Sequence, residues 1–285
     1  MSTTNYNWTS DHPRFVVDLN GDGRADVVGT GPDCVWTSVN QGGVGFGEPT
    51  FAVVAFEANA GWRVDSHPRF VTDLTGDGRA DILGFGDDGV WVSLGNGDGS
   101  FQPAHFVLQN LGFNQGWRVE SHPRFVTDLT GDGRADILGF GNDGIWVSLG
   151  NGDGSFQPER LVSGDFSHNS GWRVETPRFV TDLTGDGRAD ILGFGDDGVW
   201  VSLGNGDGSF QPASFVLQNL GFNQGWRVES HPRFVVDVSG DGKPDLVGFG
   251  DDGVWLAASN GNGTFHPAQF VLADFGATSN ITATR

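Results

Sequence analysis

Hydrophobic and polar positions along this chain repeat with a fixed period, and within each period they alternate as they do in β-strands. The stretch HPRFVTDLTGDGRADILGFG, residues 67–86, recurs five times in nearly the same letters. Successive copies lie 55, 55, 54 and 55 residues apart. Such a period is typical of a repeat architecture, in which each unit buries its apolar face only against its neighbours. The phenylalanines that mark the copies are Phe15, Phe70, Phe125, Phe179 and Phe234.

One period of the pattern contains four runs that are typical of strands. Residues 69–74 and 89–94 alternate between apolar and polar positions, residues 81–85 are a short apolar run, and residues 105–109 follow a Gly-rich turn. Glycine and aspartate stand at each junction, as turns require. Four antiparallel strands in a unit of this length are the composition of one β-propeller blade.

We therefore predict an all-β protein, a β-propeller of five four-stranded antiparallel blades in a single domain over residues 1–285. The segment NYNWTSDHPRF at the start is a shortened copy of residues 59–70, so residues 1–11 are predicted to close the ring against the last blade. Assembly of several chains into a larger ring is the alternative. Trp91 and its copies are predicted to pack between blades. The predicted blades are 12–66, 67–121, 122–175, 176–230 and 231–285.

Each copy carries an acidic loop between its first two predicted strands, DLTGDGRAD in the second copy. Oxygen-bearing side chains occupy loop positions one, three, five and nine, and the carbonyl at position seven is a further donor. Hard oxygen donors at this spacing suit Ca²⁺. Position three is Asn, Thr or Ser, so each loop has three carboxylates. Three carboxylates so close together repel one another unless a cation is bound.

The loops therefore predict up to five structural Ca²⁺ sites, whose binding energy would contribute to folding. The alternative is an Asp- and Gly-rich turn that needs no metal. An EF-hand is excluded because Gly84 stands where its bidentate Glu belongs. The predicted ligands, with position seven acting through its carbonyl, are Asp18, Asn20, Asp22, Arg24, Asp26, Asp73, Thr75, Asp77, Arg79, Asp81, Asp128, Thr130, Asp132, Arg134, Asp136, Asp182, Thr184, Asp186, Arg188, Asp190, Asp237, Ser239, Asp241, Lys243 and Asp245.

Charge and composition narrow the classes of partner. The formal net charge is −20 and the pI is about 4.4, which argues against nucleic acid and anionic membranes as partners. Cys34 is the only cysteine, so no intrachain disulfide forms. No apolar segment follows Met1. We expect a cytoplasmic protein, or one released without a recognisable signal peptide, with a monomer favoured.

The repeat units resemble known propeller families. DLTGDGRADILGFG and GVWVSLGNGDGSF resemble FG-GAP-type repeats, the Ca²⁺-loop blades of integrin α-subunit propellers. The longer signature GWRVESHPRFVTDLTGDGRADILGFGNDGIWVSLGNGDGSFQP, residues 116–158, is similar to the Psathyrella velutina lectin family, and the similarity covers essentially the whole chain. It implies a lectin that binds N-acetylglucosamine-terminated glycans in pockets between adjacent blades. Members of that family have more blades than the five copies found here.

The linkers between blades supply what a sugar site needs, an apolar plate and a few convergent polar groups. In one linker Trp117 offers a ring face, Arg118 can donate to hydroxyls or an acetamide carbonyl, and His122 can donate or accept. Asp87 and Asp88 of the neighbouring blade are further acceptors. Structural salt bridges between blades are the alternative role for these charges.

The copies of the linker are not equal. The fourth, GWRVETPRF, lacks the histidine and is one residue shorter, and the first has Thr9 in place of the arginine. We expect an altered fourth site, a doubtful first one, and avidity from several weak sites on one ring. The predicted sugar-binding residues are Trp62, Arg63, His67, Asn114, Gln115, Trp117, Arg118, His122, Trp172, Arg173, Asn223, Gln224, Trp226, Arg227 and His231.

Two other functions compete with a lectin. A glycosidase needs one specific pair of carboxylates, whereas the acids here are spread equally over five copies, and the chain has no GxSxG, HExxH or P-loop motif. We therefore predict no enzymatic activity. A protein-binding or adhesion propeller, or an engineered repeat scaffold without sugar specificity, is the remaining alternative.

Overall fold

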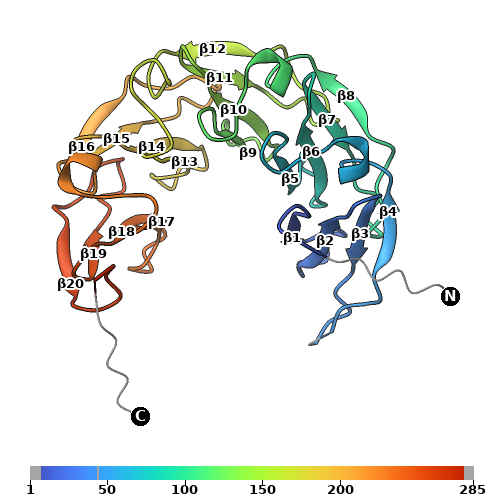
Figure 1. Cartoon of the computed structure of the whole chain (residues 1–285), viewed down its shortest axis with the longest axis horizontal. Coiled ribbons are helices and arrows are strands. Elements are labelled where there is room, and N and C mark those ends of the chain that lie inside the picture. Colours follow the sequence, from blue (N-terminus) through green and yellow to red (C-terminus); the bar gives the residue numbers. More distant parts are fainter. Residues whose placement is uncertain (1–7, 44, 279–285) are drawn as a thin grey trace. The chain divides into compact units, whose positions relative to one another are not determined.

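The computed structural model describes residues 8–43 and 45–278, which form five four-stranded antiparallel sheets (Figure 1). The four strands of each sheet are consecutive in sequence, so every sheet is one copy of the repeat. The sheets are β1 (Arg14–Val17), β2 (Asp26–Thr30), β3 (Val35–Ser38) and β4 (Thr50–Val53); β5 (Arg69–Thr72), β6 (Asp81–Phe85), β7 (Val90–Ser93) and β8 (His105–Leu108); β9 (Arg124–Thr127), β10 (Asp136–Phe140), β11 (Ile145–Ser148) and β12 (Arg160–Ser163); β13 (Arg178–Thr181), β14 (Asp190–Phe194), β15 (Val199–Ser202) and β16 (Ser214–Leu217); β17 (Arg233–Val236), β18 (Asp245–Phe249), β19 (Val254–Ala257) and β20 (Gln269–Leu272).

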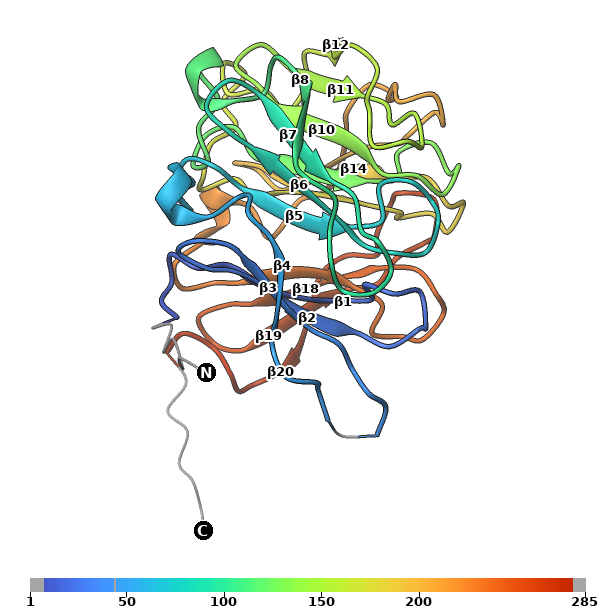
Figure 2. The ribbon, with the colours of Figure 1, turned by 90° about the vertical axis from the view of Figure 1, so that its right-hand side faces the viewer.

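The structure confirms the predicted fold class and the strands of the repeat. In the second sheet β6 has the predicted bounds, and β5, β7 and β8 lie within the predicted runs. Figure 2 shows β5, β6 and β7 side by side. Residues 1–7 and 279–285 of the predicted domain lie outside the described residues. The closure of the ring and the role assigned to residues 1–11 stay predictions.

The chain divides into two compact units, each with cores shared by adjacent sheets. The first unit comprises Met1–Val126, Gly133–Gly139 and Ser148–Arg160. In it Val28 of the first sheet packs in one cluster with Ile82 of the second. The second unit comprises Thr127–Asp132, Phe140–Val147 and Leu161–Arg285, and there Leu192 packs in one cluster with Leu246. In both clusters adjacent copies bury their apolar residues against each other, as the repeat predicts.

The second strand of the repeat is the most buried one. Every residue of β6, β10 and β14, all with the sequence DILGF, is buried. These strands pair with a neighbour on each edge, and their short apolar run suits burial on both faces. Short 3₁₀ turns, η1 (Ala58–Ala60), η2 (Phe113–Gln115) and η3 (Phe222–Gln224), lie in the linkers between sheets. Among the described residues, no helix is long and apolar enough to cross a membrane.

Candidate functional site

The linker tryptophan is a packing residue that lies against a glycine of the second strand. Gly84 pairs with Arg69 on one side and with Trp91 on the other, and a Cβ atom there would lie 2.5 Å from the Trp62 ring. The same contact joins Trp226 to Gly248, where the distance would be 2.6 Å. Only glycine leaves room for an indole at this place, which explains the G of the DILGF run.

A pocket of about 430 Å³, the Trp62 pocket, opens beside this contact. Its lining comes from the turn after β4, from the linker with Trp62 and His67, and from the hairpin between β6 and β7 with Asp87 and Asp88. Trp91 lines it as well and is 37% exposed. Two indoles and several convergent polar groups in a space of this size are typical of a small-ligand site.

In the Trp62 pocket His67 orients Asp87. The backbone N–H of Arg63 donates to Nδ1 of His67 over 3.1 Å, so the ring proton of the neutral histidine lies on Nε2. Nε2 then donates to Oδ1 of Asp87 over 3.0 Å. The His67 side chain is 7% exposed and that of Asp87 is 61% exposed. Both histidine nitrogens are therefore engaged, and the carboxylate is the group presented to a ligand.

A second pocket of about 290 Å³, the Trp226 pocket, repeats this arrangement in the fifth copy. The backbone N–H of Arg227 donates to Nδ1 of His231 over 3.0 Å, and Nε2 donates to Oδ1 of Asp251 over 2.9 Å. Trp226 and Trp255 line the pocket together with Asp252. The two copies therefore present the same constellation of His, Asp and two Trp.

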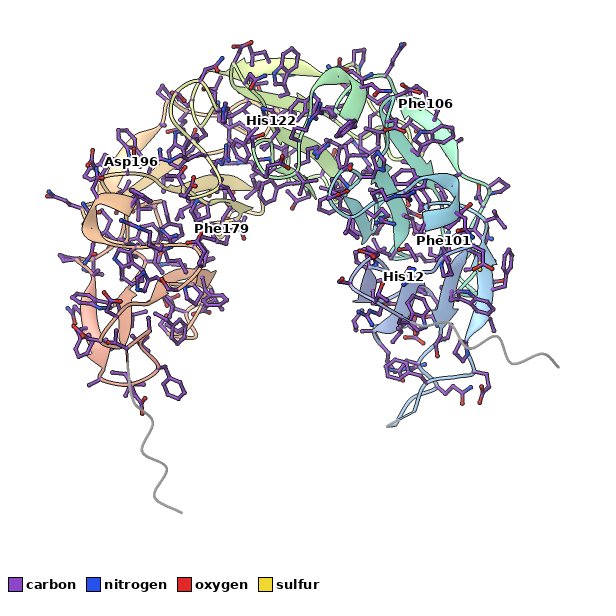
Figure 3. The ribbon with its side chains drawn as sticks, viewed as in Figure 1. His12, Phe101, Phe106, His122, Phe179 and Asp196 are labelled. Atoms are coloured by element: carbon purple, nitrogen blue, oxygen red, sulfur yellow. The ribbon has the colours of Figure 1, made fainter. Side chains whose placement is uncertain are left out.

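A third pocket of about 320 Å³, the Trp172 pocket, has a different polar arrangement. Thr176 stands in place of the histidine, and its hydroxyl accepts from the backbone N–H of Arg173 over 2.7 Å. The Arg173 guanidinium pairs with Asp196, with distances of 2.6 Å to Oδ1 and 3.4 Å to Oδ2 (Asp196 is labelled in Figure 3). The ion pair engages both carboxylate oxygens, which agrees with the altered fourth site expected from the sequence.

The predicted asparagines fix the second acid of the pocket hairpin. Nδ2 of Asn114 donates to Oδ1 of Asp88 over 2.8 Å, and Nδ2 of Asn223 donates to Oδ1 of Asp197 over 2.8 Å. Asp88 lines the Trp62 pocket and Asp197 lines the Trp172 pocket. Each asparagine therefore supports the hairpin of the copy before its own linker, from outside the pocket lining.

Three predicted sugar-binding arginines bind their own turns. Arg118 donates to the carbonyl of Phe113 over 2.7 Å and lies 3.8 Å above that ring. Arg227 has the same contacts with Phe222, at 2.6 Å and 3.7 Å. Arg63 donates to a carbonyl of η1 and lines a separate pocket beside His12. These contacts are those of groups that shape the linker.

The other predicted linker residues are also placed by the structure. Trp117 is buried against Gly139, and its ring lies 5.7 Å from that of His122 (labelled in Figure 3). Gln115 is exposed on η2. Gln224 lines the Trp226 pocket and accepts the backbone N–H of Gly221 over 3.1 Å.

Two parts of the site differ from the sequence-based interpretation. Trp91 is partly exposed beside Phe106 of β8 (Phe106 is labelled in Figure 3), with ring centroids 5.4 Å apart, and it lines the Trp62 pocket. Its copy Trp255 packs, as predicted, against the cluster that contains Leu192 and Leu246. Asp87 belongs to the same copy as the histidine that it accepts from. Gly89, two residues after Asp87, has a φ of 146°, a value that favours glycine. This glycine is the signal in the sequence that could have identified the hairpin.

The acidic loops are closed turns held by their first aspartate. Oδ1 of Asp73 accepts the backbone N–H groups of Thr75, Gly76 and Asp77, and Oδ2 accepts that of Gly78 over 2.7 Å. In the last copy the corresponding bonds from Gly242 and Gly240 lower the pKa of the Asp237 carboxyl. The loop wraps around a carboxylate that stays ionised, as in an Asx-type turn.

The ninth residue of the loop is buried. Oδ2 of Asp81 accepts from Leu74 over 3.0 Å, and Oδ1 accepts from Gly95 of the following turn over 2.8 Å. Desolvation raises the pKa of Asp81 to about 6, and repulsion from Asp77 and Asp73 adds to the rise. The two hydrogen bonds act in the opposite direction and lower the pKa. Asp81 thus joins the acidic loop to the second turn of the sheet.

The arginine at position seven of the loop forms an ion pair with the aspartate at position five. Arg79 pairs with Asp77 over 2.5 Å, and Arg188 pairs with Asp186 over 2.5 Å. Within residues 8–43 and 45–278, no group of three acidic, His or Cys side chains is arranged to hold a metal ion. The side-chain donors of the loop are all oxygens, the ligand type that hard cations take.

Comparisons with known proteins place the chain among solved structures. No protein-family model and no curated protein matches it. An Agrocybe aegerita lectin, whose structure is described as explaining specific recognition of non-reducing terminal N-acetylglucosamine, is 48% identical and matches 94% of this chain and 68% of the lectin chain, with a TM-score of 0.91. The Photorhabdus luminescens Tc holotoxin pore matches 94% of this chain and 12% of its own, with 16% identity and a TM-score of 0.58, and shares the fold alone.

Proposed function

Because the chain belongs to the same family as the Agrocybe aegerita lectin, we propose that it is a non-enzymatic lectin that binds glycans ending in N-acetylglucosamine. The observation that carries the proposal is the constellation repeated in the Trp62 and Trp226 pockets. In each, an exposed aspartate is oriented by a buried histidine beside two indoles. The signature of residues 116–158 further supports membership of the Psathyrella velutina lectin family.

The groups in each pocket divide the recognition of a sugar ring. The oriented carboxylate, Asp87 or Asp251, accepts hydrogen bonds from hydroxyl or amide groups of the sugar. A hydrogen bond to an ionised acceptor is stronger than one to a neutral acceptor. The indoles offer apolar surface for the ring face and the acetamide methyl group. Because the histidine already makes both of its hydrogen bonds, the carboxylate is held in position before the ligand arrives.

Repetition of the pocket makes the proposed lectin multivalent. Single sites of this kind are weak, but sites on one chain raise the effective concentration of clustered glycan ends. The Trp62 and Trp226 pockets have the full constellation. In the Trp172 pocket the corresponding acid, Asp196, forms an ion pair with Arg173. We therefore assign the binding capacity chiefly to the second and fifth copies, which carry both the histidine and the aspartate.

We also propose that the acidic loops bind Ca²⁺ as a structural ion. The residues that would hold it are the aspartates at positions one, five and nine, the neutral oxygen at position three and the carbonyl at position seven. Desolvation is the main cause of the raised pKa of Asp81, and a cation there would offset the repulsion from Asp77 and Asp73 that adds to it. Bound Ca²⁺ would stabilise the turn between the first two strands of a blade.

The proposed function is tested on a glycan array, with and without Ca²⁺. We expect signal on glycans with non-reducing terminal N-acetylglucosamine and none on the same glycans capped with galactose. Absence of any N-acetylglucosamine signal would refute the proposal. A protein partner bound in the absence of glycan would instead support an FG-GAP-type adhesion propeller.

A further inference from the structure

The Trp62 pocket has an acid, Glu57, at a position where the Trp172 and Trp226 pockets have none. Glu57 lies five residues before the linker tryptophan, and its carbonyl accepts the backbone N–H of Trp62 over 3.3 Å. The same backbone contact identifies the equivalent residues as Gly112, Ser167 and Gly221. A carboxylate at this position is therefore specific to one pocket.

The Glu57 carboxylate is buried without a full set of partners. The residue lines the Trp62 pocket and is 7% exposed, and its Oε2 atom receives no hydrogen bond from the described residues. A buried carboxylate oxygen without a donor is costly, because it has given up water and gained nothing in return. A ligand that brings a donor, and above all a positive charge, removes that cost.

The rest of the Trp62 pocket also favours a cation. Asp87 and Asp88 line it with Glu57, and its lining contains no lysine or arginine. Nδ1 of His67 accepts a backbone N–H, and Nε2 faces Asp87. Trp62 and Trp91 add the faces of two aromatic rings, which attract ammonium groups.

We propose that the Trp62 pocket binds sugars that carry a free, protonated amine, such as the 2-amino-2-deoxyglucose end of a deacetylated glycan, in preference to their N-acetylated forms. The proposal rests on the proposed function, because it assumes that the pocket takes a sugar ring. A sugar ammonium carries a positive charge and three N–H donors, whereas an acetamide has one N–H group and no charge. In the Trp226 pocket glycine replaces the glutamate, so that pocket keeps the neutral specificity.

The test measures binding of glucosamine and of N-acetylglucosamine by calorimetry at about pH 6, where the amine is protonated. The variants are Glu57→Gln, which keeps the shape and removes the charge, and Glu57→Gly, which copies Gly221 of the Trp226 pocket. Asp251→Asn is the control in the Trp226 pocket. Melting curves of all variants report whether folding is preserved.

We expect wild-type protein to bind glucosamine, and both Glu57 variants to bind it at least tenfold more weakly. Glucosamine binding should persist in Asp251→Asn, and N-acetylglucosamine binding should persist in Glu57→Gln. Normal N-acetylglucosamine binding with no glucosamine binding, or with glucosamine binding indifferent to Glu57, overturns this inference and leaves the proposed function standing. Failure of both sugars to bind overturns both.

Discussion

Nε2 of His67 donates a hydrogen bond to Oδ1 of Asp87 over 3.0 Å, while Nδ1 of the same ring accepts the backbone N–H of Arg63. The histidine is buried and the carboxylate is exposed. The buried ring therefore fixes the orientation of a carboxylate that a ligand can reach. The same relationship joins His231 to Asp251.

Replacing the histidine should weaken sugar binding without direct loss of a sugar contact. In His67→Ala the Asp87 carboxylate loses a charge-assisted hydrogen bond and its fixed orientation, so we expect roughly tenfold weaker binding at this pocket. Calorimetric titration with glucosamine and with N-acetylglucosamine measures the effect. The control is His12→Ala, because the hairpin of the first copy has Pro32 where Asp87 stands in the second. An equal loss in both variants would contradict the assigned role.

Replacing the linker arginines Arg173 and Arg227 should affect two different properties, sugar binding and stability. Arg173→Ala releases both oxygens of Asp196, and we expect sugar binding at the Trp172 pocket to increase several-fold. Arg227→Ala removes a cation–π contact and a bond to the Phe222 carbonyl, so we expect a loss of about 1 kcal/mol of stability. Binding stoichiometry and urea unfolding measure the two effects. Reduced binding in Arg173→Ala would show that Arg173 itself contacts the sugar.

The contact between Trp62 and Gly84 should make that glycine sensitive to a single methyl group. A Cβ atom would lie 2.5 Å from the Trp62 ring, so we expect Gly84→Ala to destabilise the protein by about 1–3 kcal/mol. Gly45→Ala is the matched control, because no atom lies within 4 Å of a Cβ built there. Denaturant unfolding compares them, and similar stabilities of the two variants would contradict the packing role.

The fold was predictable because the same pattern of apolar runs and turn residues occurs in each of the five copies. Three copies of the DILGF run and the related runs DVVGT and DLVGF of the first and fifth copies, each preceded by an acidic loop, indicate a largely buried strand in every copy. In β7 Val90 and Val92 are buried, whereas Trp91 between them is partly exposed. What lies against the exposed face was not predictable, because that depends on the linker of the same copy and on the preceding sheet.

The candidate site was only partly predictable, for a similar reason. Trp62, His67, Trp226 and His231 were identified from the linker and do line pockets. The direction of an arginine is decided by a carbonyl or an aromatic ring within reach, which the sequence does not display. Arg173 differs from Arg227 because its linker is one residue shorter and carries Thr176 in place of histidine.

Calcium binding to the acidic loops should raise thermal stability. A ligand that binds only the folded protein stabilises it by mass action, and Ca²⁺ must compete with Arg79 for Asp77. We expect a higher melting temperature in Ca²⁺ than in EDTA, and a larger difference in the Arg79→Ala variant. Differential scanning calorimetry measures both. Identical curves with and without chelator would refute the calcium proposal.

The central claim is that an aspartate oriented by a buried histidine forms the sugar site of each complete copy. The most direct measurement is calorimetric titration of the wild type and of the double variant Asp87→Asn/Asp251→Asn with methyl N-acetylglucosaminide. Methyl galactoside serves as the control ligand and melting curves as the control for folding. We predict binding by the wild type that is at least tenfold weaker in a folded double variant. Equal binding by the two proteins would contradict the account.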